Sequence, residues 1–446
     1  MTRKKIKLNN MQIISLGFVT IIIIGSLLLC CPLASRTGTW TPYFDSLFTS
    51  TSATCVTGLI AFDTFTHWSL FGQIVIITLI QIGGIGFMTI VTMLSIVLKR
   101  HIGLNERKLL MESAGSMKIA GVVALIKRIC IGTFIFEGLG AVMLSIRFIP
   151  EMGMLRGIYN AVFHSISAFC NAGFDLMGRY APCSSLTRYQ DDVIVNVTIM
   201  ALIVIGGVGF FVWNDILFTK CKYKKFQLHT KIVLVTTGAL ILIGFVLFFF
   251  LEYNHAFKNL SFGNKIMASF FQSITPRTAG FNTINLTELS TGGTIITYVL
   301  MFIGGSPGST AGGIKTTTFL VLMLEAIAFA KNKSQVTIFK RRIDEATLRQ
   351  ASIVVSIYVT AVTVACIVIC ATQDCSISDT LFEVISAIST VGLTKGITPT
   401  HDAVTQITLI MLMYLGRVGV LTFAISIARR KKNIPLDRPI EKLIVG

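Results

Sequence analysis

A short segment that ends in glycine occurs four times in this chain, each time between two apolar runs, and this repetition most constrains the fold. The four segments read LFTSTSATCVTG, VFHSISAFCNAG, SFFQSITPRTAG and LFEVISAISTVG. They end at Gly58, Gly173, Gly280 and Gly392, and a phenylalanine stands ten residues before each glycine. The glycines are 115, 107 and 112 residues apart, a period that fits two apolar spans and a loop and is far longer than a solenoid repeat.

The flanking runs are long and apolar enough to cross a membrane. Of the chain, 53% is hydrophobic and 13% charged, and several apolar runs reach the ~20 residues that span a bilayer. The first run, Met11 to Cys31, follows a basic N-terminus, as the core of a signal peptide would. Its apolar part exceeds the ~7–15 residues of a signal core, so we interpret it as the first span.

Basic residues mark the cytoplasmic side. Of 39 lysines and arginines, 28 lie in five clusters: at the N-terminus and within residues 99–128, 220–231, 331–349 and 429–442. Each cluster is next to an apolar run, which is the positive-inside pattern of membrane proteins and not a sign of nucleic-acid binding. Both termini are therefore predicted in the cytoplasm, and every intervening stretch must leave the cytoplasm and return.

This pattern divides the chain into four parallel units, residues 1–100, 101–219, 220–335 and 336–446. Each unit holds a helix, a pore loop and a second helix, so the predicted class is an all-α polytopic membrane protein. The glycine-ended segments are too short to span the membrane and must enter it and return. Non-helical backbone is tolerated at that depth only where protein surrounds it or where it lines a wet cavity. One chain can thus supply all four loops of a closed ring around one pore.

The loop ends predict a cation filter made of backbone carbonyls. In the fourth loop, Thr390-Val391-Gly392 matches the tripeptide whose carbonyls replace the water shell of K⁺ in potassium channels. The loop ends carry no carboxylates, so K⁺ must be bound mainly by carbonyl oxygens. One such element alone would be an ordinary turn, but four in register favour a filter. The candidate filter residues are Thr57, Gly58, Asn171, Ala172, Gly173, Thr278, Ala279, Gly280, Thr390, Val391 and Gly392.

The filter is predicted to be irregular. Two residues before the glycines stand Val56, Asn171, Thr278 and Thr390, so the ring lacks the identity of a tetrameric channel. We therefore expect a weaker preference for K⁺ over Na⁺.

Two departures from the repeat predict a gate. The third unit's second span is interrupted within residues 304–313, where glycine and proline disfavour a helix, and we expect an irregular loop there in place of a simple kink. Arg417 replaces a repeated glycine in the fourth unit, and a mid-membrane arginine must face the protein interior or a wet cavity. It either pairs with Glu137 or forms an electrostatic barrier to cations. The candidate gate residues are Gly304, Gly305, Ser306, Gly308, Gly312, Gly313 and Arg417.

Three features stay open at this level. Lys315 and Arg277 are equally compatible with structural and functional roles. The repeated glycines at Gly83 and Gly206 could serve only close helix packing in the membrane. A disulfide between Cys183 and Cys375 is conceivable, because both fall in segments predicted outside the cytoplasm.

The residues resemble the Trk/Ktr/HKT superfamily of cation-translocating subunits, most closely the bacterial Ktr membrane subunits. The resemblance covers nearly the whole chain and rests on SATCVTGL, FCNAGFD, TPRTAGFN, STVGLTKG, GGSPGSTAGGIKTTT and LGRVGVLT. It implies eight transmembrane helices in a pseudo-four-fold arrangement, one pore per subunit, an intramembrane loop beside Arg417 that obstructs it, and homodimers in the bacterial plasma membrane. Potassium is the implied cargo, with Na⁺ as a possible second ion, and Gly58 is the residue that goes with potassium in this superfamily.

The resemblance also implies a cytosolic RCK-type ring of nucleotide-binding subunits. Because the chain has no GxGxxG or Walker A stretch, nucleotide control would have to come from such a partner. The basic cytoplasmic clusters suit membrane lipids or an acidic partner surface. The main alternative is an alternating-access cation symporter, which would be built from inverted repeats. An intramembrane enzyme would need paired carboxylates or a HExxH signature, and neither lies in a predicted span.

Overall fold

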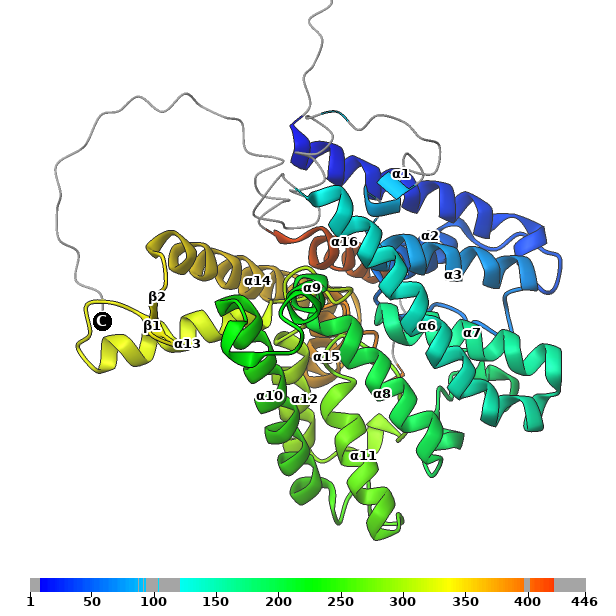
Figure 1. Cartoon of the computed structure of the whole chain (residues 1–446). Coiled ribbons are helices and arrows are strands. Elements are labelled where there is room, and N and C mark those ends of the chain that lie inside the picture. Colours follow the sequence, from blue (N-terminus) through cyan, green and yellow to red (C-terminus); the bar gives the residue numbers. More distant parts are fainter. Residues whose placement is uncertain are drawn as a thin grey trace, which may run out of the picture.

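The computed structural model describes residues 9–86, 88–90, 92–93, 103, 121–396 and 402–420, and these residues are mostly helical (Figure 1). The helices in chain order are α1 (Asn10–Cys30), α2 (Tyr43–Cys55), α3 (Leu70–Ile85), α6 (Val122–Met152), α7 (Met154–Cys170), α8 (Val193–Val208), α9 (Phe210–Phe218), α10 (Leu228–Glu252), α11 (Phe262–Ile274), α12 (Thr291–Phe302), α13 (Thr316–Ala330), α14 (Glu345–Thr372), α15 (Ile377–Ile388) and α16 (Ala403–Val418). Single 3₁₀ turns are η1 (Pro32–Ala34), η2 (Met177–Arg179), η3 (Thr187–Tyr189), η4 (Tyr223–Lys225) and η5 (Leu286–Glu288). The predicted all-α class is confirmed at this level.

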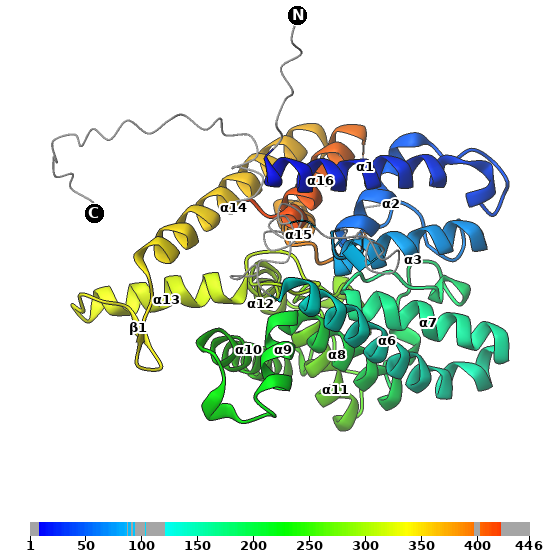
Figure 2. The same ribbon diagram turned by 45° about the horizontal axis from the view of Figure 1, so that its top comes forward.

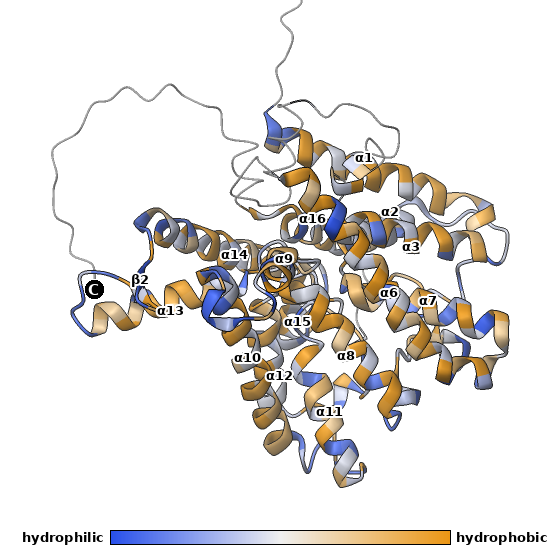
Figure 3. Ribbon diagram, in the orientation of Figure 1, coloured by the Kyte–Doolittle hydropathy of each residue, from blue (hydrophilic) through white to orange (hydrophobic). Residues whose placement is uncertain are grey.

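In the part of the chain that the structure describes, four helices are long and apolar enough to cross a membrane: α1, α6, α10 and α14, with 21, 31, 25 and 28 residues. At most a third of the apolar stretch of each is buried within the protein. Large side chains such as Phe250, which is 73% exposed, point outward from them. Figure 3 shows α1 and α10 as predominantly hydrophobic ribbons. This surface suits lipid, and α1 matches the first span predicted from the sequence.

The helices that follow the glycine-ended segments are shorter, and they differ from the prediction. Helices α3, α8, α12 and α16 have 16, 16, 12 and 16 residues. An interruption was predicted only in the third unit. However, α3, α8 and α16 also end at glycines with positive φ, namely Gly86, Gly209 and Gly419. Glycine adopts this conformation freely and so ends a helix where other residues would continue it.

The second unit shows this interruption most clearly, because α8 and α9 meet at 88°. Among the described residues, the helices long and apolar enough to span a membrane are therefore four, or five if this bent pair counts as one span. The predicted eight transmembrane helices therefore stay a prediction. The described residues support a polytopic helical fold in which the second helix of the second unit is broken.

Helices α13 and α14 form an arm that extends from the other helices toward a small hairpin (Figures 1 and 2). Strand β1 (Thr337–Ile338) pairs antiparallel with β2 (Arg341–Arg342) at its tip. The hairpin belongs to the basic cluster of residues 331–349. All ten cysteines are free, so the conceivable link between Cys183 and Cys375 is not formed.

Candidate ion pathway

Each glycine-ended segment begins with a short helix, and these helices are α2, α7, α11 and α15. Two residues before the glycine, all four segments turn into the left-handed region, with φ of 59° at Val56, 61° at Asn171, 73° at Thr278 and 51° at Thr390. Asparagine tolerates this region, whereas valine and threonine rarely enter it. Strained backbone of this kind persists only where the surroundings hold it, and it gathers at functional sites. The sequence gives no signal for this shared conformation.

The four segments meet in a ring. A Cβ added at Gly58 would lie 2.5 Å from the carbonyl oxygen of Ala172, and one at Gly173 would lie 2.8 Å from that of Ala279. The series continues with a Cβ at Gly280, 2.5 Å from Val391 O, and closes with one at Gly392, 2.1 Å from Thr57 O. Each predicted filter segment therefore touches the next in the order first, second, third, fourth, first. Only glycine fits at these contacts.

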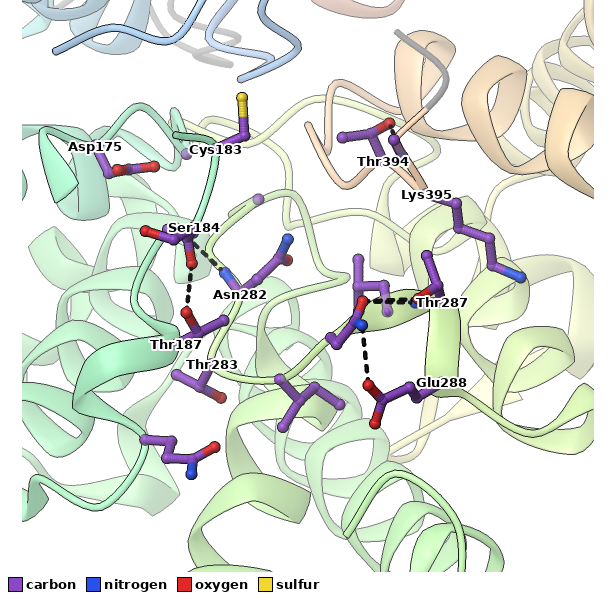
Figure 4. A pocket seen from close by; sticks show the side chains of 18 of the residues that line it. Asp175, Cys183, Ser184, Thr187, Asn282, Thr283, Thr287, Glu288, Thr394 and Lys395 are labelled. Atoms are coloured by element: carbon purple, nitrogen blue, oxygen red, sulfur yellow. Dashed lines mark hydrogen bonds between the residues drawn. The ribbon is translucent and has the colours of Figure 1, made fainter. Parts of the chain in front are cut away.

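A cavity of about 620 Å³ opens on one side of the ring (Figure 4). All four ring glycines line it, together with polar residues from the connections that follow them. The labelled side chains in Figure 4 include Asp175, Glu288 and Lys395 around this space. The cavity thus leads from the protein surface to the ring.

Asp175 is the carboxylate closest in sequence to a ring glycine, two residues after Gly173. Its Oδ1 accepts the N–H of Met177 at 2.8 Å. Burial in the connection between α7 and α8 raises the pKa of this carboxyl to about 7, and the negative charge of Asp63 acts in the same direction. Asp175 therefore changes its charge near neutral pH.

Hydroxyl groups of the short helices hold three of the segments. Ser52 Oγ accepts the N–H of Gly58 at 3.1 Å, Ser167 donates to the carbonyl of Phe174 at 2.7 Å, and Thr275 donates to that of Phe281 at 2.6 Å. Ser386 in the fourth segment has a buried hydroxyl for which the described residues provide no hydrogen-bond partner. Ser52, Ser167 and Ser386 stand six residues before their ring glycines, whereas Thr275 stands five residues before Gly280.

The repeated glycines of the following helices serve close packing against the ring segments. A Cβ at Gly83, Gly206 or Gly416 would lie 2.0 Å from a backbone carbonyl oxygen. The three oxygens belong to residues four before the ring glycine in the first, second and fourth segments, namely Thr54, Phe169 and Ile388. Close packing at Gly83 and Gly206, which the sequence left open, is therefore confirmed, and the same packing occurs at Gly416.

The third unit is irregular between α12 and α13, as its sequence predicted, and this loop packs between two neighbours. On one side, Ser306 and Thr310 donate backbone N–H groups to the carbonyls of Gly207 at 3.0 Å and Gly206 at 3.3 Å. On the other side, a Cβ at Gly312 would lie 2.1 Å from Thr390 Oγ1 of the fourth ring segment. The loop thus contacts both the end of α8 and the ring.

Arg417 joins this loop to the first unit. Its guanidinium donates to the carbonyls of Thr310 and Gly83, and at 3.2 Å to that of Gly84. Glu137 has other partners: Gln81 donates to it at 3.1 Å, and the thiol of Cys170 lies 3.9 Å away. The alternative that Arg417 pairs with Glu137 is therefore wrong. Within the described part of the chain, Arg417 has carbonyl partners and no carboxylate partner, so its positive charge is not neutralised there.

Lys315 and Arg277, whose roles the sequence left open, both form hydrogen bonds within the protein. Lys315 donates to the carbonyls of Ala311 at 2.7 Å and Gly312 at 3.3 Å, which fastens the C-terminal end of the irregular loop. Arg277 is only 7% exposed, and its guanidinium donates to the hydroxyl of Thr237 on α10 at 3.4 Å.

Comparison with known proteins decides the family. The family model described as a cation transport protein, TrkH, matches residues 8–436. The chain belongs to this family. The resemblance predicted from the sequence motifs is therefore confirmed.

Curated relatives of this family are similar over their whole length. The potassium/sodium uptake protein NtpJ of Enterococcus hirae is 39% identical over 451 residues, covering 100% of this chain and 99% of its own. The Ktr system potassium uptake protein B of Bacillus subtilis is 39% identical over 425 residues, covering 95% and 94%. The crystal structure of the potassium transporter TrkH from Vibrio parahaemolyticus shares the fold, with a TM-score of 0.74, 18% identity and coverage of 96% and 86%.

Proposed function

We propose that this chain takes up potassium through a channel-like pore in the bacterial plasma membrane. The observation that carries the proposal is the closed ring in which each glycine lies against a backbone carbonyl of the next segment. The names of the relatives, a potassium/sodium uptake protein and a potassium uptake protein, support K⁺ as the cargo and Na⁺ as a second ion. The chain is a transporter and not an enzyme.

The proposed pore runs through the ring along a pseudo-four-fold axis, with one helix, pore loop, helix unit on each side. Carbonyls of the predicted filter residues replace the hydration shell of K⁺. The short helices α2, α7, α11 and α15 precede these residues, so their C-terminal ends, which carry partial negative charge, favour a cation there. The different residues before the glycines make the filter less symmetric than that of a tetrameric channel.

The irregular loop of residues 304–313 and Arg417 form the proposed gate. The loop contacts the fourth ring segment through Gly312, and Arg417 ties Thr310 of the loop to α3. An arginine that is not neutralised by a carboxylate repels cations in a medium of low dielectric constant. Moving the loop would therefore remove both an obstruction and a positive charge from the ion path.

A partner is needed to set this gate, because an equilibrium shifts only with a ligand that binds its two states differently. We propose a homodimer docked on a cytosolic RCK-type ring, which supplies nucleotide control. The clusters at 220–231 and 331–349 form the basic cytoplasmic face and also bind anionic lipid. Both termini lie on this side in the proposal.

The experiment is uptake of potassium by a bacterial strain without its own uptake systems. Expression of this chain should restore growth at low potassium, and co-expression of a nucleotide-binding ring should increase uptake. In liposomes, the chain alone should leak potassium with little response to ATP or ADP, and the ring should make the flux nucleotide-dependent. Absence of potassium flux in both assays would refute the proposed function, and a strong nucleotide response of the chain alone would refute the role of the ring.

An alternating-access cation symporter is the second candidate, because broken helices such as α8 and α9 occur at the sites of secondary transporters. The two mechanisms differ in their flux. A pore passes K⁺ down its own gradient with no second ion, whereas a symporter stops when its coupling ion is removed from both sides.

Uptake is expected to depend on external pH through Asp175, which lines the proposed outer cavity. Its carboxyl, with a pKa of about 7, is mostly neutral at pH 6 and mostly ionised at pH 8. A negative charge in a cleft concentrates cations, so uptake at limiting potassium should rise on the order of threefold between these values. The measurement is initial rubidium uptake at fixed internal pH.

The matched variants separate Asp175 from its neighbours. Asp175→Asn should give the low rate at both pH values. Glu288→Gln, in the same cavity, should keep the rise. Asp63→Asn removes a negative charge that raises the pKa of Asp175, so it should move the rise to lower pH. A rise that survives in Asp175→Asn would assign it to another group.

A further inference from the structure

One position of the short helices distinguishes the four ring segments from one another. Nine residues before the ring glycines stand Thr49, His164, Phe271 and Glu383. All four are buried, and Glu383 is only 2% exposed. Burial of a carboxyl group costs free energy unless hydrogen bonds compensate it. The partners of this position therefore decide what it does in each segment.

In the fourth segment, Glu383 holds the chain that follows the glycine. The hydroxyl of Thr394, two residues after Gly392, donates a hydrogen bond to Glu383 Oε1. The same hydroxyl accepts the N–H of Gly396 at 3.0 Å. Thr394 and Gly396 both line the cavity above the ring. Glu383 thus connects α15 to the outer end of the fourth segment.

In the second segment, His164 makes the equivalent connection. Its Nε2 accepts the N–H of Leu176, three residues after Gly173, at 3.3 Å. Its Nδ1 lies 2.8 Å from the carbonyl oxygen of Asn160 and donates to it. These two partners require the neutral ring with its proton on Nδ1. A helix of the second unit is thereby linked to the chain beyond its own glycine.

The other two segments lack this connection. The hydroxyl of Thr49 is buried and has no hydrogen-bond partner among the described residues, and Phe271 has no polar group in its side chain. Because the ring runs in the order first, second, third, fourth, the second and fourth segments lie opposite each other. The connections from His164 and Glu383 are therefore present in two opposite segments of the ring, the second and the fourth.

We propose that Glu383, with His164 on the opposite side, is a positioning residue that sets K⁺ selectivity by fixing the outer end of its ring segment. The inference rests on the proposed function and assigns roles to residues outside the carbonyl ring. Thr390 keeps a strained left-handed conformation, with φ of 51°, and such strain relaxes unless the surroundings hold the backbone. A carbonyl that can turn away discriminates less between ions of different size.

The test measures K⁺ and Na⁺ flux of the full-length chain in liposomes. Glu383→Ala should lower the ratio of K⁺ to Na⁺ flux by roughly fivefold, the effect of one lost hydrogen bond. Glu383→Gln keeps an oxygen acceptor for Thr394 and should restore the ratio to within about twofold. Thr49→Val occupies the same position in the first segment, removes a hydroxyl that has no partner, and should leave the ratio unchanged.

Thr394→Val covers the case in which Glu383→Ala does not fold. It should lower the ratio as much as Glu383→Ala, and the double variant should add nothing further, because both remove the same contact. A ratio in Glu383→Ala or Thr394→Val equal to that of Thr49→Val would overturn the inference. Failure of Glu383→Gln to restore the ratio would also overturn it. If these variants keep the ratio while Gly392→Ser changes it, only the inference fails; if the ratio stays constant in all of them, the proposed filter fails too.

Discussion

Gly392→Ser is expected to reduce potassium uptake by at least roughly tenfold and to relax the preference for K⁺ over Na⁺. Gly392 has a φ of 86°, and a Cβ there would lie 2.1 Å from Thr57 O and 2.8 Å from the Cα of Gly58. A side chain in this conformation costs ~1–2 kcal/mol before any clash, and 1.4 kcal/mol corresponds to a factor of ten. Both clashing atoms are backbone, so the contact between the fourth and first segments must open. Rubidium uptake and K⁺ against Na⁺ flux in liposomes measure the effect.

Gly238→Ser is the matched control, because a Cβ at Gly238 in α10 meets nothing within 4 Å. It should retain both uptake and selectivity. A well-expressed Gly392→Ser protein with unchanged selectivity would remove Gly392 from the filter.

Arg417→Ala is expected to increase basal cation flux on the order of tenfold or more in the absence of a partner ring. The change removes the hydrogen bonds from the guanidinium to Thr310 on the irregular loop and to Gly83 on α3. A hydrogen bond from a charged group contributes ~1.5–3 kcal/mol, and 1.4 kcal/mol shifts an equilibrium tenfold. The variant also removes the positive charge that repels cations. Deletion of part of residues 304–313 should act in the same direction.

Arg417→Lys provides the graded comparison, since lysine keeps the charge but lacks the planar fork that reaches several carbonyls. Its basal flux should lie between those of the unaltered chain and Arg417→Ala. If flux falls in both Arg417→Ala and the loop deletion while selectivity is preserved, the gate assignment must be withdrawn.

Much of the fold could be predicted because its pattern is local. Apolar runs of bilayer length predict spans such as α1, and clusters of glycine and proline predict the irregular loop at 304–313. The breaks at Gly86, Gly209 and Gly419 were missed, because a single glycine in an apolar run is compatible with a continuous helix. Only the backbone conformation distinguishes the two outcomes.

The candidate site, like the fold, could be predicted from the sequence only in part. The positions of the ring glycines follow from the alignment of the four segments, whereas the equivalent role of Thr275 does not, because its offset differs by one residue. The sequence offered Glu137 as a partner for Arg417 on the basis of charge alone. In the structure, Arg417 donates to backbone carbonyls. Because every residue carries a carbonyl, the residue types in the sequence could not identify these partners.

The sequence by itself determined that the chain is helical and apolar, that one segment recurs four times, and that the family is one of cation transporters. These properties depend on composition and on spacings within single units. Tertiary structure alone decided the order in which the ring closes, the contact of Gly312 with Thr390, and the bond from Arg417 to Thr310. Arg417 and Thr310 are 107 positions apart in the sequence. Such contacts depend on how packed helices bring distant parts of the backbone together, and no local sequence pattern specifies this.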